Sequence, residues 1–105
     1  KIVFMGTPEF AVASLRRLVE EGHTLCGVFT QPDKPKTVGR KQILTPPAVK
    51  LEAQRLGLPV YQPETFKNRA CEPLLRELAP ELIAVVAYGK ILPRHVLTLA
   101  PYGCI

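Results

Sequence analysis

The chain has 105 residues, of which 47% are hydrophobic and 22% are charged. This length predicts one domain or part of one, and this composition excludes a disordered chain, because the apolar side chains suffice for a core. The formal net charge of +5 favours an anionic partner over a cationic one.

The positive charge is concentrated in one segment. Between Gln31 and Lys50, five cations stand against a single carboxylate, Asp33, so this segment carries +4 and the rest of the chain carries +1. A local excess of this kind points to an anionic partner such as nucleic acid more strongly than a diffuse excess would. Charge alone is equally compatible with a solvated basic loop that has no partner.

The three cysteines indicate a reducing compartment. Cys26, Cys71 and Cys104 are widely spaced and include no CxxC pair, so neither a zinc site nor a redox dithiol is expected. Cys26 and Cys104 lie in apolar runs and are expected to be small buried hydrophobic residues. Free thiols fit the cytoplasm. No apolar run approaches the ~20 residues of a membrane span, and the first residues show no signal peptide, so no membrane partner is expected.

The first thirty residues predict a strand, a helix and a second strand. Lys1–Met5 is an apolar run typical of a strand that is buried on both faces. Apolar residues then recur at helical spacing, and Gly22 is expected to cap the end of that helix. Leu25–Thr30 predicts the second strand. The three elements form a βαβ unit with a right-handed crossover.

A long basic loop is expected next, followed by alternating helices and strands. The later elements are a helix after Pro46–Pro47, strands over Leu58–Pro63 and Glu81–Gly89, helices over Cys71–Leu78 and from near Pro93, and a strand starting at Gly103–Ile105. This alternation predicts an α/β fold with a mostly parallel, doubly wound sheet and helices on both faces. Because the chain stops where a strand begins, it is expected to be a truncated part of a larger domain.

Ligands of open α/β sheets bind outside the carboxyl ends of the strands. Three segments satisfy that condition: Gly6–Phe10, Thr30–Pro35 and Ala87–Pro93. In the first, Gly6 allows a tight turn, Thr7 is expected to be the helix N-cap and Pro8 the first helical residue. Backbone N–H groups at such a helix start are a candidate substrate-pocket turn. The alternative is a well-capped connection without a ligand, and no dinucleotide or phosphate-loop motif is present.

The segment after the fourth strand is a second candidate pocket. Tyr88 brings an aromatic plane, Gly89 lets the backbone approach a ligand, and Ile91 and Leu92 bring apolar walls. A flat heterocycle would fit such a slot. The alternative is that Ile91 and Leu92 only plug the end of the sheet.

No complete active site is visible in the sequence. His23 follows a helix cap and is expected to be a surface turn residue, and His95 has no carboxylate near it along the chain. The carboxylates without an evident partner are Glu9, Asp33, Glu64 and Glu81. Neither a nucleophile elbow nor a zinc-protease motif is present. Residue chemistry alone therefore assigns no catalytic residue.

Five segments resemble the methionyl-tRNA formyltransferase family in order and spacing: KIVFMGTPEFAV, VFTQPDKP, LTPPAVK, GLPVYQPE and VVAYGKILP…GCI. The similarity covers nearly all of the chain and is weakest across Phe66–Ala79. It implies a Rossmann-like formyltransferase fold, in which residues 1–105 are the N-terminal portion of the catalytic domain and a C-terminal β-barrel that binds tRNA is absent. It also implies transfer of a formyl group from 10-formyltetrahydrofolate to the amino group of methionyl initiator tRNA, for translation initiation. The whole protein is expected to be a monomer without a metal.

The resemblance implies where the formyl donor binds. Tyr88, Gly89, Ile91 and Leu92 match the folate-binding loop of the family. The family's Asn-x-His pair, its Ser-Leu-Leu-Pro run and a later catalytic Asp follow the strand that starts at Gly103, so no catalytic residue lies in this chain. Formyl transfer needs an oxyanion stabiliser and a proton acceptor, and the chain alone is therefore expected to be inactive.

The resemblance also implies a role for the basic loop. The residues between Asp33 and Thr45 match the loop that contacts the tRNA acceptor stem, where cations bind phosphates and add salt-dependent affinity. The expected tRNA-binding residues are Arg40 and Lys41 first, then Lys34 and Lys36. This loop reads KTVGRKQI and has fewer glycines than the common family form.

Other functions remain open. A folate-dependent formyltransferase that acts on a small amine, such as glycinamide ribonucleotide or a sugar amine, would have little use for the basic loop. A non-catalytic RNA-binding module would use the loop without any chemistry. A dinucleotide oxidoreductase is disfavoured because its glycine-rich fingerprint is absent.

Overall fold

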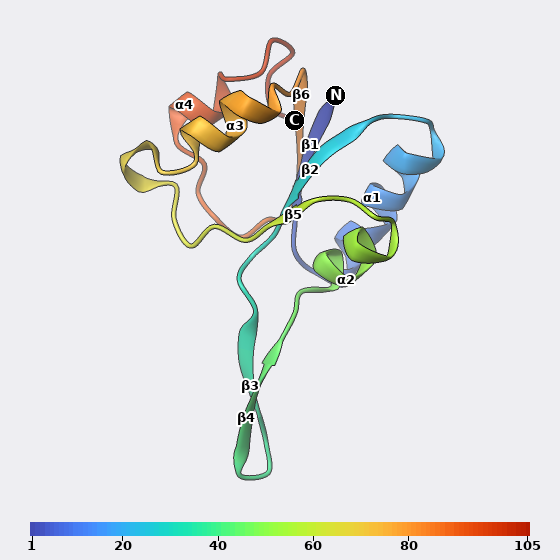
Figure 1. Ribbon diagram of the computed structural model, residues 1–105, viewed down its shortest axis with the longest axis vertical. Coiled ribbons are helices and arrows are strands. Elements are labelled where there is room, and N and C mark those ends of the chain that lie inside the picture. The colour runs from blue at the N-terminus through green and yellow to red at the C-terminus, as the bar shows by residue number, and fades with distance from the viewer.

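The computed structural model describes the backbone of residues 1–105 and every side chain except those of residues 36–38. Four parallel strands form the central sheet in the order β5-β2-β1-β6 (Figure 1). The strands are β1 (Ile2–Gly6), β2 (Leu25–Phe29), β5 (Val60–Tyr61) and β6 (Leu82–Val86). The predicted α/β fold with a mostly parallel sheet is confirmed.

Helices cover both faces of this sheet. They are α1 (Glu9–Glu20), α2 (Ala48–Arg55), α3 (Glu72–Leu78) and α4 (Arg94–Leu97), with a 3₁₀ turn, η1 (Lys67–Arg69). Successive strand residues point to opposite faces. Phe4 and Val28 therefore pack in a first core beneath α1 and α2, whereas Met5 and Phe29 pack in a second core beneath α3 and α4. Figure 1 shows the two pairs of helices on opposite sides of the sheet.

The predicted fifth strand begins beside β6. Cys104 forms a parallel bridge with Ile83, and the N–H of Ile105 donates to the carbonyl of Ile83 at 2.9 Å. The other predicted elements lie where they were expected, within three residues at their ends; the largest difference is at β6, which ends at Val86 instead of Gly89. None of the helices that the structure describes has the length and apolarity required to cross a bilayer.

The segment expected to be a basic loop is an antiparallel hairpin. Strands β3 (Lys34–Val38) and β4 (Lys41–Thr45) pair along their full length, and Gly39 and Arg40 form the turn. Gly39 has a φ of +62°, the left-handed conformation that tight hairpin turns require. Pro35 fits within β3 because each strand of a two-stranded ribbon has an open edge that needs no N–H donor. The expectation of an irregular loop is therefore wrong.

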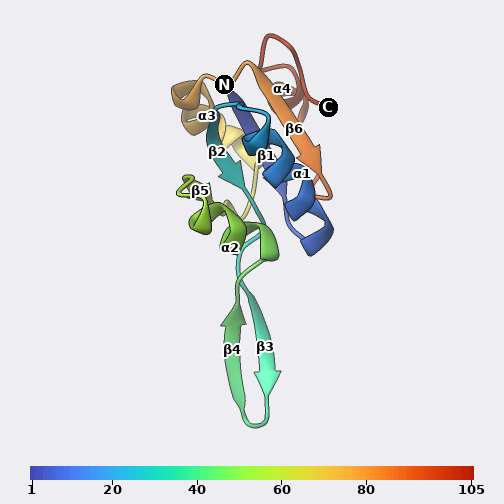
Figure 2. The same ribbon diagram turned by 90° about the vertical axis from the view of Figure 1, so that its right-hand side faces the viewer.

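The hairpin projects away from the body of the molecule, as Figures 1 and 2 show from two directions. It contributes to the longest extent of the chain, 48 Å. Lys34 lies at its base, opposite Thr45, while Arg40 and Lys41 lie at its tip. At ~3.4 Å per strand residue, base and tip are about 14 Å apart. The side chain of Lys36 lies outside the described residues.

A buried carboxylate joins α1 to α2. Glu52 in α2 is 6% exposed, and it accepts hydrogen bonds from Arg55 Nε at 2.9 Å and from Arg16 Nε of α1 at 2.8 Å. The hydrogen bonds from Arg55 and then Arg16 hold the pKa of Glu52 at about 2, below its ordinary value of 4.5. The ionised form is therefore favoured in the folded state.

Replacing Glu52→Gln is expected to lower the free energy of unfolding near neutral pH, and the loss should shrink in acid. A carboxyl whose pKa is lowered by folding stabilises the protein above its unfolded pKa, and this contribution disappears as pH falls from about 4.5 toward about 2. Urea unfolding near pH 7 and near pH 3 measures the difference. Glu21→Gln, which breaks an exposed pair with Arg17, should change little at either pH. An equal Glu52→Gln effect at both pH values would contradict this account.

Candidate functional site

The carboxyl ends of β1, β2 and β6 bring the three predicted segments into contact. The Thr7 hydroxyl donates a hydrogen bond to the Tyr88 carbonyl at 2.7 Å and accepts one from the Gln31 N–H at 3.4 Å. Pro8 occupies the N-cap position of α1, and no side chain caps that helix. The expectations that Thr7 is the N-cap and Pro8 the first helical residue are therefore wrong. The hydroxyl instead joins the turns that follow three strands.

Tyr88 does not offer its ring to a ligand. The side chain is 2% exposed and packs edge-on against Phe66 in the second core, with ring centroids 5.9 Å apart. Burial raises the pKa of the Tyr88 hydroxyl, so it stays neutral. The expectation of an aromatic plane in the pocket is wrong, because an apolar ring is more stable in the core than at an open strand end. Tyr88 supports the segment from beneath.

The remaining residues of this segment point in different directions. Gly89 is exposed and has a φ of +92°, and a Cβ added there would lie 2.7 Å from Nε2 of Gln31. Ile91 is 96% exposed, whereas Leu92 is partly buried against the second core. Leu92 therefore plugs the end of the sheet, and Ile91 does not.

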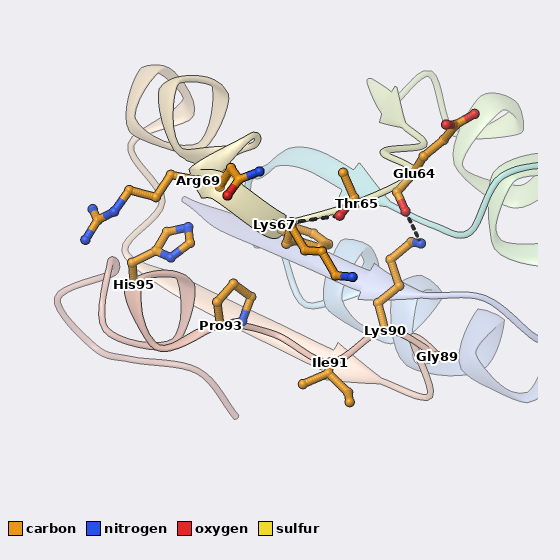
Figure 3. A pocket seen from close by; sticks show the side chains of 11 residues that line it. Glu64, Thr65, Lys67, Arg69, Gly89, Lys90, Ile91, Pro93 and His95 are labelled. Atoms are coloured by element: carbon orange, nitrogen blue, oxygen red, sulfur yellow. Dashed lines mark hydrogen bonds between the residues drawn. The ribbon is translucent and has the colours of Figure 1, made fainter.

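A cavity of about 730 Å³ opens beside this segment (Figure 3). One wall is residues 64–69, which precede α3, and the other consists of residues from Gly89 to His95 other than Leu92 and Arg94. The ammonium of Lys90 donates to the carbonyl of Glu64 at 2.6 Å and so spans the two walls. Of the four predicted donor-binding residues, Gly89 and Ile91 line the cavity.

The cavity combines apolar surface with positive charge. Phe66 and Pro93 contribute apolar atoms, and Lys67 brings a cation to its margin. The guanidinium of Arg69 is paired with Glu72 at 2.7 Å. His95 Nε2 is buried without a hydrogen-bond partner among the described groups. Such a hollow suits a molecule with a flat apolar body and a carboxylate. Its positive wall falls where the family resemblance is weakest, so the sequence does not predict it.

The hairpin cations are available to an external anion. Lys34, Arg40 and Lys41 make no ion pair with any carboxylate whose side chain the structure describes. Lys50 differs, because its ammonium lies 3.1 Å and 3.2 Å from the two oxygens of Asp33. The expectation that Asp33 has no partner is therefore wrong. Hydrogen bonds from Gln62 and then Lys50 lower the pKa of Asp33.

No nucleophile or metal site is assembled among the side chains described. Burial raises the pKa of all three thiols, which disfavours the reactive thiolate. Cys71 is buried, while Cys26 and Cys104 are only half-buried, contrary to expectation. The described His, Cys, Asp and Glu residues form no group of three that could hold a metal ion.

Comparison with known proteins identifies the family. Residues 1–105 match the sequence model of a protein family that is described as formyl transferase. The chain belongs to the formyl transferase family. Methionyl-tRNA formyltransferases from Pelotomaculum thermopropionicum and Bacillus subtilis are 53% and 54% identical to it, over 105 and 107 residues. Each alignment covers 100% of the chain but only 33% and 32% of the relative, so the chain spans about a third of their length.

Two solved formyltransferase structures share the fold of this chain. Phosphoribosylglycinamide formyltransferase from Bacillus halodurans has a TM-score of 0.66 at 13% identity, covering 98% of this chain and 53% of that one. The enzyme of the same name from Streptococcus pneumoniae has a TM-score of 0.61 at 19% identity, with coverage of 99% and 53%. At these identities the likeness concerns the fold alone, and it confirms the formyltransferase fold.

Proposed function

We propose that this chain is the N-terminal portion of an enzyme that transfers a formyl group from 10-formyltetrahydrofolate to the amino group of methionyl initiator tRNA. The observation that carries the proposal is the projecting β3–β4 hairpin, whose described cations have no partner in the part of the protein described. Relatives named methionyl-tRNA formyltransferase, more than 50% identical, support the same acceptor. Translation initiation in the cytoplasm, in a monomeric enzyme, is part of this proposal.

The hairpin would hold the RNA. Arg40 and Lys41 at the tip, and Lys34 at the base, are spaced along a two-stranded ribbon that can follow a phosphate backbone. Lys36 lies between them in sequence. Contacts of this kind place the substrate and make its affinity fall with salt. The hairpin would thus deliver the aminoacylated end toward the carboxyl edge of the sheet.

The donor would lie along the Tyr88–Leu92 segment. Gly89 is exposed, Ile91 is almost fully exposed, and the adjacent cavity offers apolar walls with the ammonium of Lys67 at its margin. A reduced folate carries a flat heterocycle, an aromatic linker and carboxylates. This combination of surfaces fits those chemical features without a metal.

The reaction needs further groups. The amine attacks the formyl carbon, negative charge develops on the formyl oxygen, and a proton leaves the attacking nitrogen. Tyr88 is buried and neutral, and Thr7 is engaged with a carbonyl, so neither is placed to serve as the base. We therefore propose that catalytic groups come from sequence beyond this chain, as the one-third coverage of its relatives allows.

A chimera provides the test. This chain replaces the matching third of the P. thermopropionicum relative, and formylation of methionyl-tRNA is compared with formylation of a small amine such as glycinamide ribonucleotide. The chimera is expected to favour methionyl-tRNA by about a hundredfold in kcat/KM, because binding energy from the RNA is used at the reacting amine. The chain alone should show no turnover. Equal use of the small amine, or turnover by the chain alone, would refute the proposal.

A further inference from the structure

The two ends of the hairpin are joined by an ion pair. Asp33 immediately precedes β3, and Lys50 lies in α2, shortly after β4. The Lys50 ammonium donates hydrogen bonds to both Asp33 oxygens, at 3.1 Å and 3.2 Å. Both side chains are partly shielded, at 25% exposure for Asp33 and 21% for Lys50. The pair therefore closes the hairpin at the point where it leaves the body (Figure 1).

A third side chain fastens the same point to the sheet. Gln62 follows β5, and its amide nitrogen donates to Asp33 Oδ1 at 2.6 Å and to the main-chain oxygen of Gln31 at 3.1 Å. Charge-assisted hydrogen bonds in a partly desolvated site hold their geometry better than exposed pairs do. Asp33 is thus bound from both the helix side and the sheet side.

The cluster at the hairpin base also reaches the segment proposed for the donor. The N–H of Gln31 donates to the Thr7 hydroxyl, which itself donates to the Tyr88 carbonyl. The side chain of Gln31 lies beside Gly89, since a Cβ added there would meet its Nε2 at 2.7 Å. Gln31 therefore connects the Tyr88–Leu92 segment to the cluster of Asp33, Lys50 and Gln62, which forms the anchor of the hairpin.

We propose that Asp33 is a positioning residue, whose contacts with Lys50 and Gln62 set the angle at which the hairpin leaves the body, and so its direction relative to the Tyr88–Leu92 segment. The inference rests on the proposed function, because the hairpin is taken to carry the RNA acceptor. A carboxylate inside a basic RNA-binding segment weakens phosphate binding, so affinity for RNA does not explain it. Its role in holding the hairpin base does.

The variant Asp33→Asn in the chimera separates positioning from electrostatics. It keeps the size of the side chain and removes one negative charge, so electrostatics alone predicts equal or tighter RNA binding and undiminished turnover. Loss of the anchor predicts that kcat with methionyl-tRNA falls about tenfold while the Kd for that RNA does not rise, because the acceptor amine is misplaced. The matched control is Glu21→Gln, which breaks the exposed Arg17 pair of α1 and should leave kcat unchanged.

A distance measurement reports on the anchor without any acceptor. Spin labels are placed through bio-orthogonal side chains at Gln42 in β4 and at Glu20 in α1, both exposed, so the natural cysteines stay in place. Pulsed electron paramagnetic resonance measures the distance between the two labels. The distribution of this distance should be narrow in the chimera and broad after Asp33→Asn. The exchange Asp33→Lys with Lys50→Asp, which restores an ion pair, should narrow it again.

The outcomes distinguish the inference from the proposed function. If the spin-label distance distribution of Asp33→Asn is as narrow as that of the parent chimera, Asp33 does not hold the hairpin base. If that distribution is broad but kcat with methionyl-tRNA is unchanged, Asp33 has no positioning role in the reaction. A parent chimera that formylates only small amines would refute the tRNA acceptor, and the distance distributions would still decide whether Asp33 holds the hairpin.

Discussion

Charge reversal at the hairpin tip, Arg40→Glu with Lys41→Glu, is expected to lower kcat/KM for methionyl-tRNA on the order of fiftyfold in the chimera. Each charge-assisted phosphate contact contributes about 1 kcal/mol or more, and reversal adds repulsion to the loss of two such contacts. The tip lies about 14 Å from the hairpin base along the strands, so the KM for the formyl donor should stay unchanged. Steady-state kinetics with each substrate varied measures both values.

Two controls show whether the loss of kcat/KM is caused by the charges at the hairpin tip. The exchange Arg40→Lys with Lys41→Arg preserves both charges and should keep most of the activity. Arg17→Glu places a reversal on the exposed face of α1, away from the hairpin, and should have little effect. Turnover of methionyl-tRNA that is unaffected by the double reversal would remove the hairpin from the RNA-binding surface.

Replacement of Gly6→Ala is expected to destabilise the protein by about 2–3 kcal/mol. Gly6 is buried where β1 passes β6, and an added Cβ would lie 2.8 Å from the carbonyl oxygen of Val86 and 2.8 Å from Cε2 of Phe4. The carbonyl is main chain in a paired strand and cannot move away without disturbing the sheet. Urea unfolding measures the change.

Gly57→Ala is the matched control, because it separates crowding from backbone conformation. Gly57 has a φ of +73°, but an added Cβ meets nothing within 4 Å. Its cost should therefore be only the roughly 1 kcal/mol of a left-handed alanine. Equal losses for Gly6→Ala and Gly57→Ala would show that the contact between β1 and β6 is not tightly packed at this point.

The layered core follows from patterns that are local in the sequence. Ile2–Met5 and Leu25–Thr30 are apolar runs whose residues are buried, Cys26 partly so, because both faces of the sheet are packed. Gly22 and Gly57 end helices with positive φ, as a glycine after a helical pattern predicts. Such signals depend on neighbouring residues, so they remain valid without knowledge of the tertiary structure.

The hairpin and the details of the site depend on contacts that are distant in sequence. Pro35 and the many cations argue against strands, and only the pairing of β3 with β4 outweighs them. Thr7 has the right residue type for an N-cap, but the Tyr88 carbonyl, 81 residues away, takes its hydroxyl. The Tyr88 ring enters the core because space exists beside Phe66, which no local pattern reveals.

The partner of Asp33 could in part have been inferred. Lys50 follows Asp33 by 17 residues, and both lie in segments that resemble a family motif while having no assigned role there. Because a hairpin brings its two ends together, recognising strands on either side of Gly39 would have placed Asp33 near the start of the helix that carries Lys50. The contribution of Gln62 from β5 required the structure.

The most direct test of phosphate binding by the hairpin is the dependence of methionyl-tRNA turnover on salt concentration. The logarithm of kcat/KM should fall with the logarithm of salt concentration, and Arg40→Gln with Lys41→Gln should make that slope less negative by about 1 to 2, as expected for two lost phosphate contacts. The same slope in the parent chimera and the double variant would contradict the account, whatever the absolute rates.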